Sequence, residues 1–160
     1  MLIYWWRFLS LLLTSLSLGM SFAHVLEMPV RLRWPATFWA DVTTFHGLYD
    51  MFGRIGAVID VSAIGACAIL AVLVRARRPA FAFSLTAAIM LAIGLGLWFA
   101  QVSPMNAVMA DWSTYVGAVA VDPVRQQWEF GHTTVAIAKL LAAAALFLSV
   151  LADTRQAPRA

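Results

Sequence analysis

The sequence predicts an all-α fold, namely an integral membrane bundle of four helices in antiparallel up-down order. Of the 160 residues, 62% are hydrophobic and 12% are charged, and the mean hydropathy is +0.83. Soluble domains are far more polar, so a water-soluble globule is excluded. The chain also contains four apolar runs of about 20 residues, the length that a helix needs to cross a bilayer. A single cysteine excludes a fold held by internal disulfides.

The predicted spans cover residues 8–26, 55–74, 80–102 and 133–151, and together they occupy the chain as one domain, residues 1–160. Aromatic residues and an arginine precede the first span, as expected at a membrane surface. A short turn rich in arginine and ending in Pro79 separates the second span from the third. Connectors that contain proline join the first span to the second and the third span to the fourth. The sequence has no internal repeat that would suggest a second unit.

The arginines indicate how these spans are oriented, because positive residues near span ends favour the cytoplasmic side. One set of arginines comprises Arg7, Arg75, Arg77, Arg78, Arg155 and Arg159, and the opposite set comprises Arg31, Arg33, Arg54 and Arg125. The larger set predicts that both termini are cytoplasmic, in a bacterial inner membrane. Because the basic residues form no continuous stripe, we expect the lipid bilayer as partner and no nucleic acid.

The first 23 residues also fit a signal peptide, because an apolar stretch follows Arg7 and Ser21-Phe22-Ala23 has the small residues of a cleavage site. Cleavage would leave three spans and make His24 the N-terminal residue, able to chelate copper through its amine and ring. We favour the uncleaved chain, because four helices close a bundle more naturally than three.

A cluster of ionisable residues is predicted at the outer membrane boundary. The first span ends with His24 and Glu27, and the fourth begins with Glu129 and His132. Residues three apart share one helix face. In antiparallel helices the histidine is the deeper member of both pairs, so two histidines should lie beneath two carboxylates. Ionisable residues at such depth are costly and are functional candidates.

This set predicts a metal site. Two imidazoles and two carboxylates are sufficient ligands for iron, manganese or zinc, and soluble di-iron bundles use Glu-x-x-His on facing helices. His46 and Asp50 could add ligands, but the third span has no glutamate, so a mononuclear centre is preferred. In the alternative interpretation, the cluster is a neutral or salt-bridged network that only satisfies buried polar groups.

Two deeper charges, Asp60 and Lys139, lie at matching depth in the second and fourth spans, so we expect them to pair. A role in helix packing is favoured over a proton relay. His46, Asp50 and Arg54 step by four residues, and we interpret them as an exposed ion-pair ladder.

Three further motifs resemble the anthrone oxygenase-like family of small four-helix membrane proteins. They are SFAHVLEMP at residues 21–29, VSPMN at residues 102–106, and a tryptophan, Trp128, four residues before His132. The resemblance covers nearly the whole chain. It implies oxidation of a fused-ring phenolic anthrone to a quinone by molecular oxygen, without an organic cofactor. It also implies His132 and Asn106 as catalytic residues, with His132 removing a ring proton and Asn106 binding the enolate oxygen.

The chain departs from that family where Val135 replaces a frequent arginine. We therefore expect an oxidoreductase or oxygenase-like membrane protein acting on another lipophilic small molecule, phenolic or quinonoid. His24, Glu27, Glu129 and His132 are its candidate metal ligands, for iron, manganese, copper or zinc. The alternative is a non-catalytic accessory or small-molecule-binding protein. A transporter would require a homo-oligomer, because four spans without inverted repeats give little basis for alternating access.

Overall fold

The structure is a computed structural model that describes residues 1–44, 49–110 and 121–154. These residues are almost entirely helical, with described turns at residues 32–35 and 74–77. In chain order the helices are α1 (Leu2–Arg31), α2 (Ala36–Thr44), α3 (Asp50–Leu73), α4 (Arg78–Leu97), the π-helix η2 (Trp98–Val102), α5 (Ser103–Ala110) and α7 (Val121–Thr154).

Four helical segments are long and apolar enough to cross a membrane: Leu2–Arg31, Met51–Leu73, Arg78–Ala110 and Val121–Asp153. The predicted all-α membrane bundle is therefore confirmed. The predicted span limits are corrected at several ends, because an apolar run marks the hydrocarbon depth and not the end of the helix. The first helix continues through Pro29, the third continues past residue 102, and the fourth begins well before residue 133.

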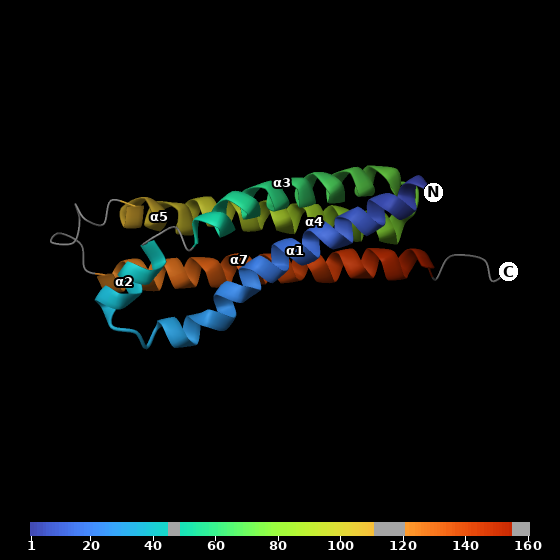
Figure 1. The fold of residues 1–160 in the computed structure, drawn as a ribbon. Coiled ribbons are helices and arrows are strands. Elements are labelled where there is room, and N and C mark those ends of the chain that lie inside the picture. Colours follow the sequence, from blue (N-terminus) through green and yellow to red (C-terminus); the bar gives the residue numbers. More distant parts are fainter. Residues whose placement is uncertain (45–48, 111–120, 155–160) are drawn as a thin grey trace.

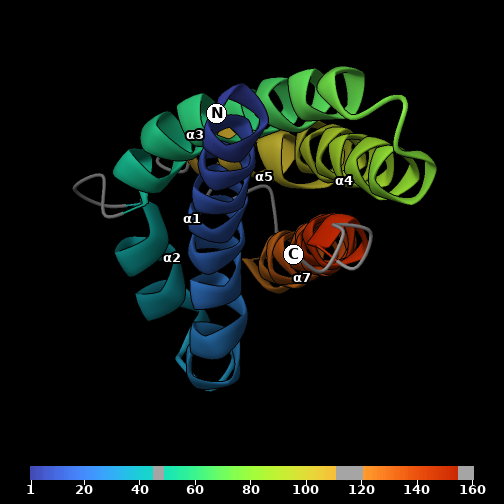
Figure 2. The same cartoon turned by 90° about the vertical axis from the view of Figure 1, so that its right-hand side faces the viewer.

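The described chain passes back and forth along one long axis, and both ends lie at the same end of the bundle (Figure 1). We call this the termini end and the opposite end the loop end. Figure 2 shows that α3 crosses the bundle obliquely, starting on the side of α1 and α2 and finishing over α4. The short helix α2 lies at the loop end and packs against α7 and α5.

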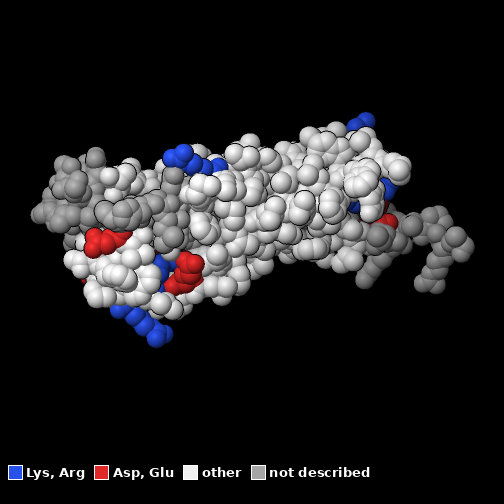
Figure 3. All heavy atoms as spheres, viewed as in Figure 1, with Lys and Arg blue, Asp and Glu red and all other residues white. Residues whose placement is uncertain are grey.

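On the face seen in Figure 3, residues other than Lys, Arg, Asp and Glu cover the middle of the bundle, and the visible charges gather towards its two ends. The exposed leucine, isoleucine, valine and phenylalanine side chains come from all four long segments. A band of this kind suits lipid, where outward apolar side chains cost nothing. The apolar band is consistent with the bilayer environment that the composition predicts.

The buried face of α1 is polar. Its buried residues are Ser10, Thr14, Ser17, Ser21, His24 and Arg31. Small hydroxyl-bearing side chains allow close approach between membrane helices and supply hydrogen bonds across them. At the termini end, Arg7 of α1 and Arg77, just before α4, both form ion pairs with Asp153 of α7. These contacts fix the face that α1 turns towards the other helices.

Two apolar clusters fill the rest of the interior. The cluster nearer the termini end joins α3, α4 and α7 through residues such as Leu70, Leu91 and Leu146. The cluster nearer the loop end is centred on Trp39 and Trp128, packed against Val102. The candidate site lies between them.

Candidate functional site

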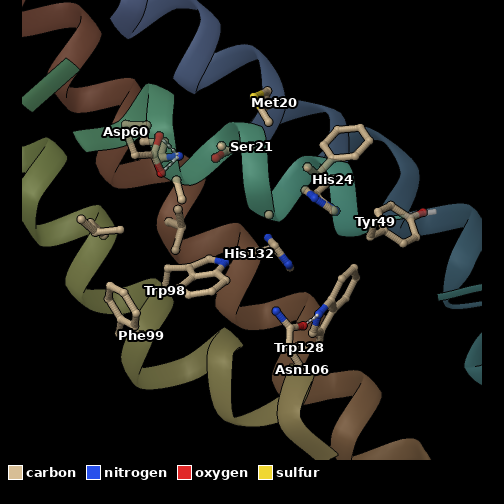
Figure 4. A pocket seen from close by; sticks show the side chains of 17 residues that line it. Met20, Ser21, His24, Tyr49, Asp60, Trp98, Phe99, Asn106, Trp128 and His132 are labelled. Carbon is tan, nitrogen blue, oxygen red and sulfur yellow. Dashed lines mark hydrogen bonds and ion pairs between the residues drawn. The ribbon is translucent and has the colours of Figure 1, made fainter. Parts of the chain in front are cut away.

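A pocket opens between α1, α3, the segment from α4 to α5, and α7 (Figure 4). The space between its lining side chains is about 710 Å³, including the part at its mouth. Its polar and aromatic lining residues are Ser21, His24, Tyr49, Phe52, Asp60, Trp98, Phe99, Asn106, Trp128, His132 and Lys139. A cavity with apolar walls and a few convergent polar groups is the usual form of a small-molecule site.

The two predicted histidines meet inside this pocket. The rings of His24 and His132 are stacked, with centroids 4.0 Å apart and planes 19° from parallel. Both residues are buried, with 6% and 8% of their surface exposed. Nδ1 of His24 is buried and has no hydrogen-bond partner among the described residues. A buried polar atom without a partner is costly, so this nitrogen is available to a ligand.

Trp128 orients the other predicted catalytic residue. Its indole Nε1 donates a 2.7 Å hydrogen bond to Oδ1 of Asn106. An indole N–H can only donate, which identifies the acceptor atom of Asn106 as its oxygen. The amide NH₂ of Asn106 is then left to donate to other groups, and Asn106 lines the pocket. The ring of Trp128 also packs edge-on against His132, with centroids 4.3 Å apart.

The two predicted carboxylates bind Arg31 and do not face the histidines. Glu129 accepts from Nε and Nη2 of Arg31 at 2.8 and 2.6 Å, and the Glu129 and Arg31 side chains are 3% and 1% exposed. Glu27 accepts from Nη1 of Arg31 at 2.5 Å, but it is half exposed. Arg31 also donates to the backbone oxygen of His24 at 2.8 Å. This buried ion network agrees with the salt-bridged interpretation of the cluster.

Two aromatic side chains complete the ion network. Trp39, which α2 brings to the site, donates from Nε1 to Oε1 of Glu129 at 3.2 Å. Tyr49 donates its hydroxyl to Glu27 at 3.0 Å. Burial raises the pKa of Tyr49 above its ordinary value, so this hydroxyl stays protonated and keeps its role as donor. Few polar atoms of the network are left for a ligand.

The four predicted metal ligands do not fit a metal in this arrangement. The rings of His24 and His132 lie nearly parallel, so their nitrogen lone pairs do not converge on one point. The carboxylates of Glu27 and Glu129 are held by a guanidinium. In the described part of the chain, no three His, Cys, Asp or Glu side chains are grouped so that they could hold a metal ion.

Asp60 and Lys139 form the predicted ion pair in the pocket wall. Nζ of Lys139 lies 2.8 Å from both carboxylate oxygens of Asp60, and Ser17 donates to the same carboxylate at 2.6 Å. The prediction from matching depth is confirmed. The pair joins α3 to α7 and also gives the pocket a charged, hydrogen-bonding surface.

The backbone beside His132 is packed unusually closely. A Cβ on Gly131 would lie 2.9 Å from Cγ2 of Val102 and 3.1 Å from Cβ of Gln101. Both neighbours belong to the π-helix η2, and π-helical turns occur often at functional sites. Pro104 follows in α5 and has no N–H for the regular helix pattern. Gly131 thus lets α7 bring His132 close to the segment that carries Trp98.

The structure therefore brings His24, His132 and Asn106 to one pocket and leaves Glu27 and Glu129 outside its lining. Arg31 was not predicted as a site residue. A signal was present, because Glu27 and Arg31 are four apart on one helix, a spacing that favours an ion pair. Of the predicted ladder, His46 and the side chain of Asp50 lie outside the described residues.

No match to this chain was found among protein families, curated proteins or solved structures. The resemblance to the anthrone oxygenase-like family rests on the sequence motifs alone.

Proposed function

We propose that the pocket binds a lipophilic aromatic molecule and oxidises it with molecular oxygen, as an integral membrane oxidoreductase. The observation that supports this most is the unpartnered buried Nδ1 of His24 in a pocket that also contains His132 and the amide of Asn106. These groups can accept and donate hydrogen bonds to a phenol or a quinone. Trp98, Phe52 and Trp128 supply aromatic walls suited to a flat ring.

The chemistry fits a substrate with an acidic CH₂ between a carbonyl-bearing ring system and a second ring. His132 takes a proton from this carbon, and the NH₂ of Asn106 stabilises the enolate oxygen that forms. The electron-rich carbanion then reduces dioxygen. Overall, the CH₂ group and O₂ give a carbonyl group and one molecule of water. The co-reactant is dioxygen, and no organic cofactor is needed.

Oxygen uptake by proteoliposomes tests this proposal, with 1,8-dihydroxyanthrone as the probe and quinone absorbance as the second readout. Wild-type protein should exceed the protein-free oxidation rate, and His132→Ala should lower the catalysed rate about 10² to 10⁴-fold, the usual contribution of a general base. Leu140→Ala is the control, because Leu140 lies on the same helix and is 56% exposed. Equal rates for His132→Ala and wild type would remove the mechanism.

A second candidate function is binding without catalysis, as an accessory or small-molecule-binding protein. The observation that favours it is the Arg31 network, which engages both carboxylates in ion pairs. Saturable binding of the same probe, without oxygen uptake above the protein-free rate, would favour this function over oxidation.

The location of the site follows from the proposed topology. With both termini in the cytoplasm of a bacterium, the loop end and the site would lie towards the outer side of the inner membrane. Cysteine labelling of single-cysteine variants from either side of the membrane tests this orientation. Four spans are enough to enclose this pocket within one chain, so function in this form does not require the homo-oligomer that a transporter would need.

A further inference from the structure

The contact between α3 and α4 changes character along its length. Towards the termini end it is filled by buried apolar residues, among them Leu70 of α3 and Leu91 of α4. Nearer the loop end the lining of the pocket replaces this packing: Asp60 lies almost three turns from Leu70 along α3, and Leu95 lies about one turn beyond Leu91 along α4. The pocket therefore lies where the packed interface between these two helices ends.

At this place the rim of the pocket is formed by small, exposed residues of α3 and by an aromatic residue of η2. Gly53 and Ala57 of α3 line the pocket and are both exposed, and Phe99 of η2 is 61% exposed. A Cβ added at Gly53 would meet nothing within 4 Å. The protein surface is therefore open beside these residues.

Of the residues on this rim, Ala57 and Phe99 lie within the apolar runs 55–74 and 80–102, and Gly53 lies one turn from Ala57 towards the loop end. Gly53 and Ala57 belong to the apolar segment Met51–Leu73, and Phe99 belongs to Arg78–Ala110. Irregular or open surface at the depth of such runs meets acyl chains and not water. Inside, the pocket offers the unpartnered nitrogen of His24 and the amide NH₂ of Asn106. The pocket thus has a polar interior and an apolar sideways exit.

We propose that the pocket holds the aromatic head of a quinone or phenol that carries a long aliphatic chain, and that the chain leaves between Gly53 and Phe99 into the bilayer. The inference rests on the proposed function and specifies its substrate class. The polar interior hydrogen-bonds the oxygens of the head group, and the exposed rim lets the chain stay among lipid tails. A ligand without a chain would occupy the interior alone.

Binding in lipid nanodiscs tests the inference with two probes of one head group, a decyl-substituted and a methyl-substituted benzoquinone. Quenching of tryptophan fluorescence reports binding, because Trp98 and Trp128 line the pocket. Gly53→Phe places a ring in the exit. Gly65→Phe is the matched control, since a Cβ at Gly65 also meets nothing within 4 Å and Gly65 lies outside the pocket lining.

Gly53→Phe should weaken binding of the decyl probe at least about tenfold and of the methyl probe less than about threefold, because only the decyl chain needs the exit. Gly65→Phe should change neither affinity. Equal losses for both probes, or no loss for the decyl probe, would overturn the exit while leaving the proposed function standing. If neither probe binds the wild type, the proposed function fails and the exit fails with it.

A second pair of variants guards against misfolding of Gly53→Phe. Ala57→Phe blocks the exit from the next turn of α3, and Ala68→Phe places the same ring at an exposed position outside the pocket lining. Circular dichroism checks that all variants keep their helices. If Gly53→Phe does not fold, the selective loss of the decyl probe should appear in Ala57→Phe, and its absence there would overturn the exit.

Discussion

Replacing Arg31 by methionine should destabilise the protein more than any other single arginine replacement at the loop end. The Arg31 side chain is 1% exposed and makes two hydrogen bonds, of 2.8 and 2.6 Å, to the carboxylate of Glu129. Methionine fills similar space but carries no charge. The variant therefore leaves Glu129, itself 3% exposed, with Trp39 Nε1 at 3.2 Å as its remaining side-chain donor among the described residues.

The size of the effect follows from burial. Removing one partner of a buried ion pair costs about 3–5 kcal/mol, because the other charge is left without compensation. The contact with Glu27 adds little, about 0–1 kcal/mol, since Glu27 is half exposed. Glu129→Gln alone should cost less, about 2–3 kcal/mol, because Arg31 keeps Glu27 and the His24 carbonyl as partners. The double variant removes both charges and should be less destabilised than the sum of the two, by about 3 kcal/mol.

Unfolding in mixed micelles, followed by tryptophan fluorescence, measures these free energies. Arg33→Met is the matched control, because Arg33 is exposed two residues further along the chain, and it should change stability by less than about 0.5 kcal/mol. The reasoning fails if Arg31→Met costs no more than Arg33→Met. It also fails if the losses from Arg31→Met and Glu129→Gln simply add in the double variant, because the two groups would then not be coupled.

Three further results are expected. Gly131→Ala should lower stability by about 1–3 kcal/mol, because its Cβ would overlap Val102 at 2.9 Å, and a thermal melt in detergent should show partial relief in the double variant with Val102→Ala. Lys139→Met should cost about 3–5 kcal/mol by leaving Asp60 unpaired, and adding Asp60→Asn should recover part of this loss in the same unfolding assay. Elemental analysis of the purified protein should find no stoichiometric metal bound through the two stacked histidines. Near-stoichiometric metal in the wild type that is lost when both histidines are replaced by alanine would contradict the site geometry.

The transmembrane segments and the internal ion pair could be predicted because the bilayer imposes their positions. A helix rises about 1.5 Å per residue, so counting residues from a membrane boundary places a side chain at a known depth. Counting in this way predicted that Asp60 pairs with Lys139 and that His24 lies next to His132. The structure shows both contacts. Depth alone was enough for these residues, because all four lie in continuous helices whose apolar runs fix their distance from the membrane boundary.

The same count could not predict the partner of the carboxylates. Arg31 was assigned to a connector, because the apolar run of the first span ends at residue 26. In the structure α1 continues through Pro29 and carries Arg31 on the same face as Glu27. Hydropathy cannot detect a helix that continues beyond the hydrocarbon, and it cannot show that an arginine near a boundary turns inwards. The π-helix η2 could not be predicted either, because hydropathy carries no information on backbone hydrogen bonds, and its close packing against Gly131 joins distant parts of the chain.

The pairing of both carboxylates with Arg31 changes the kind of ligand that the pocket can bind. If both carboxylates faced the histidines, the site would carry negative charge and attract a cation. Instead Arg31 compensates Glu129 outside the pocket, and Lys139 compensates Asp60 in its wall. The groups left to a ligand are then the imidazoles and the amide of Asn106, which donate and accept hydrogen bonds without a fixed charge. A pocket balanced in this way selects an uncharged ligand with oxygen atoms on an aromatic ring, since a charged ligand would lose its hydration without gaining an opposite charge.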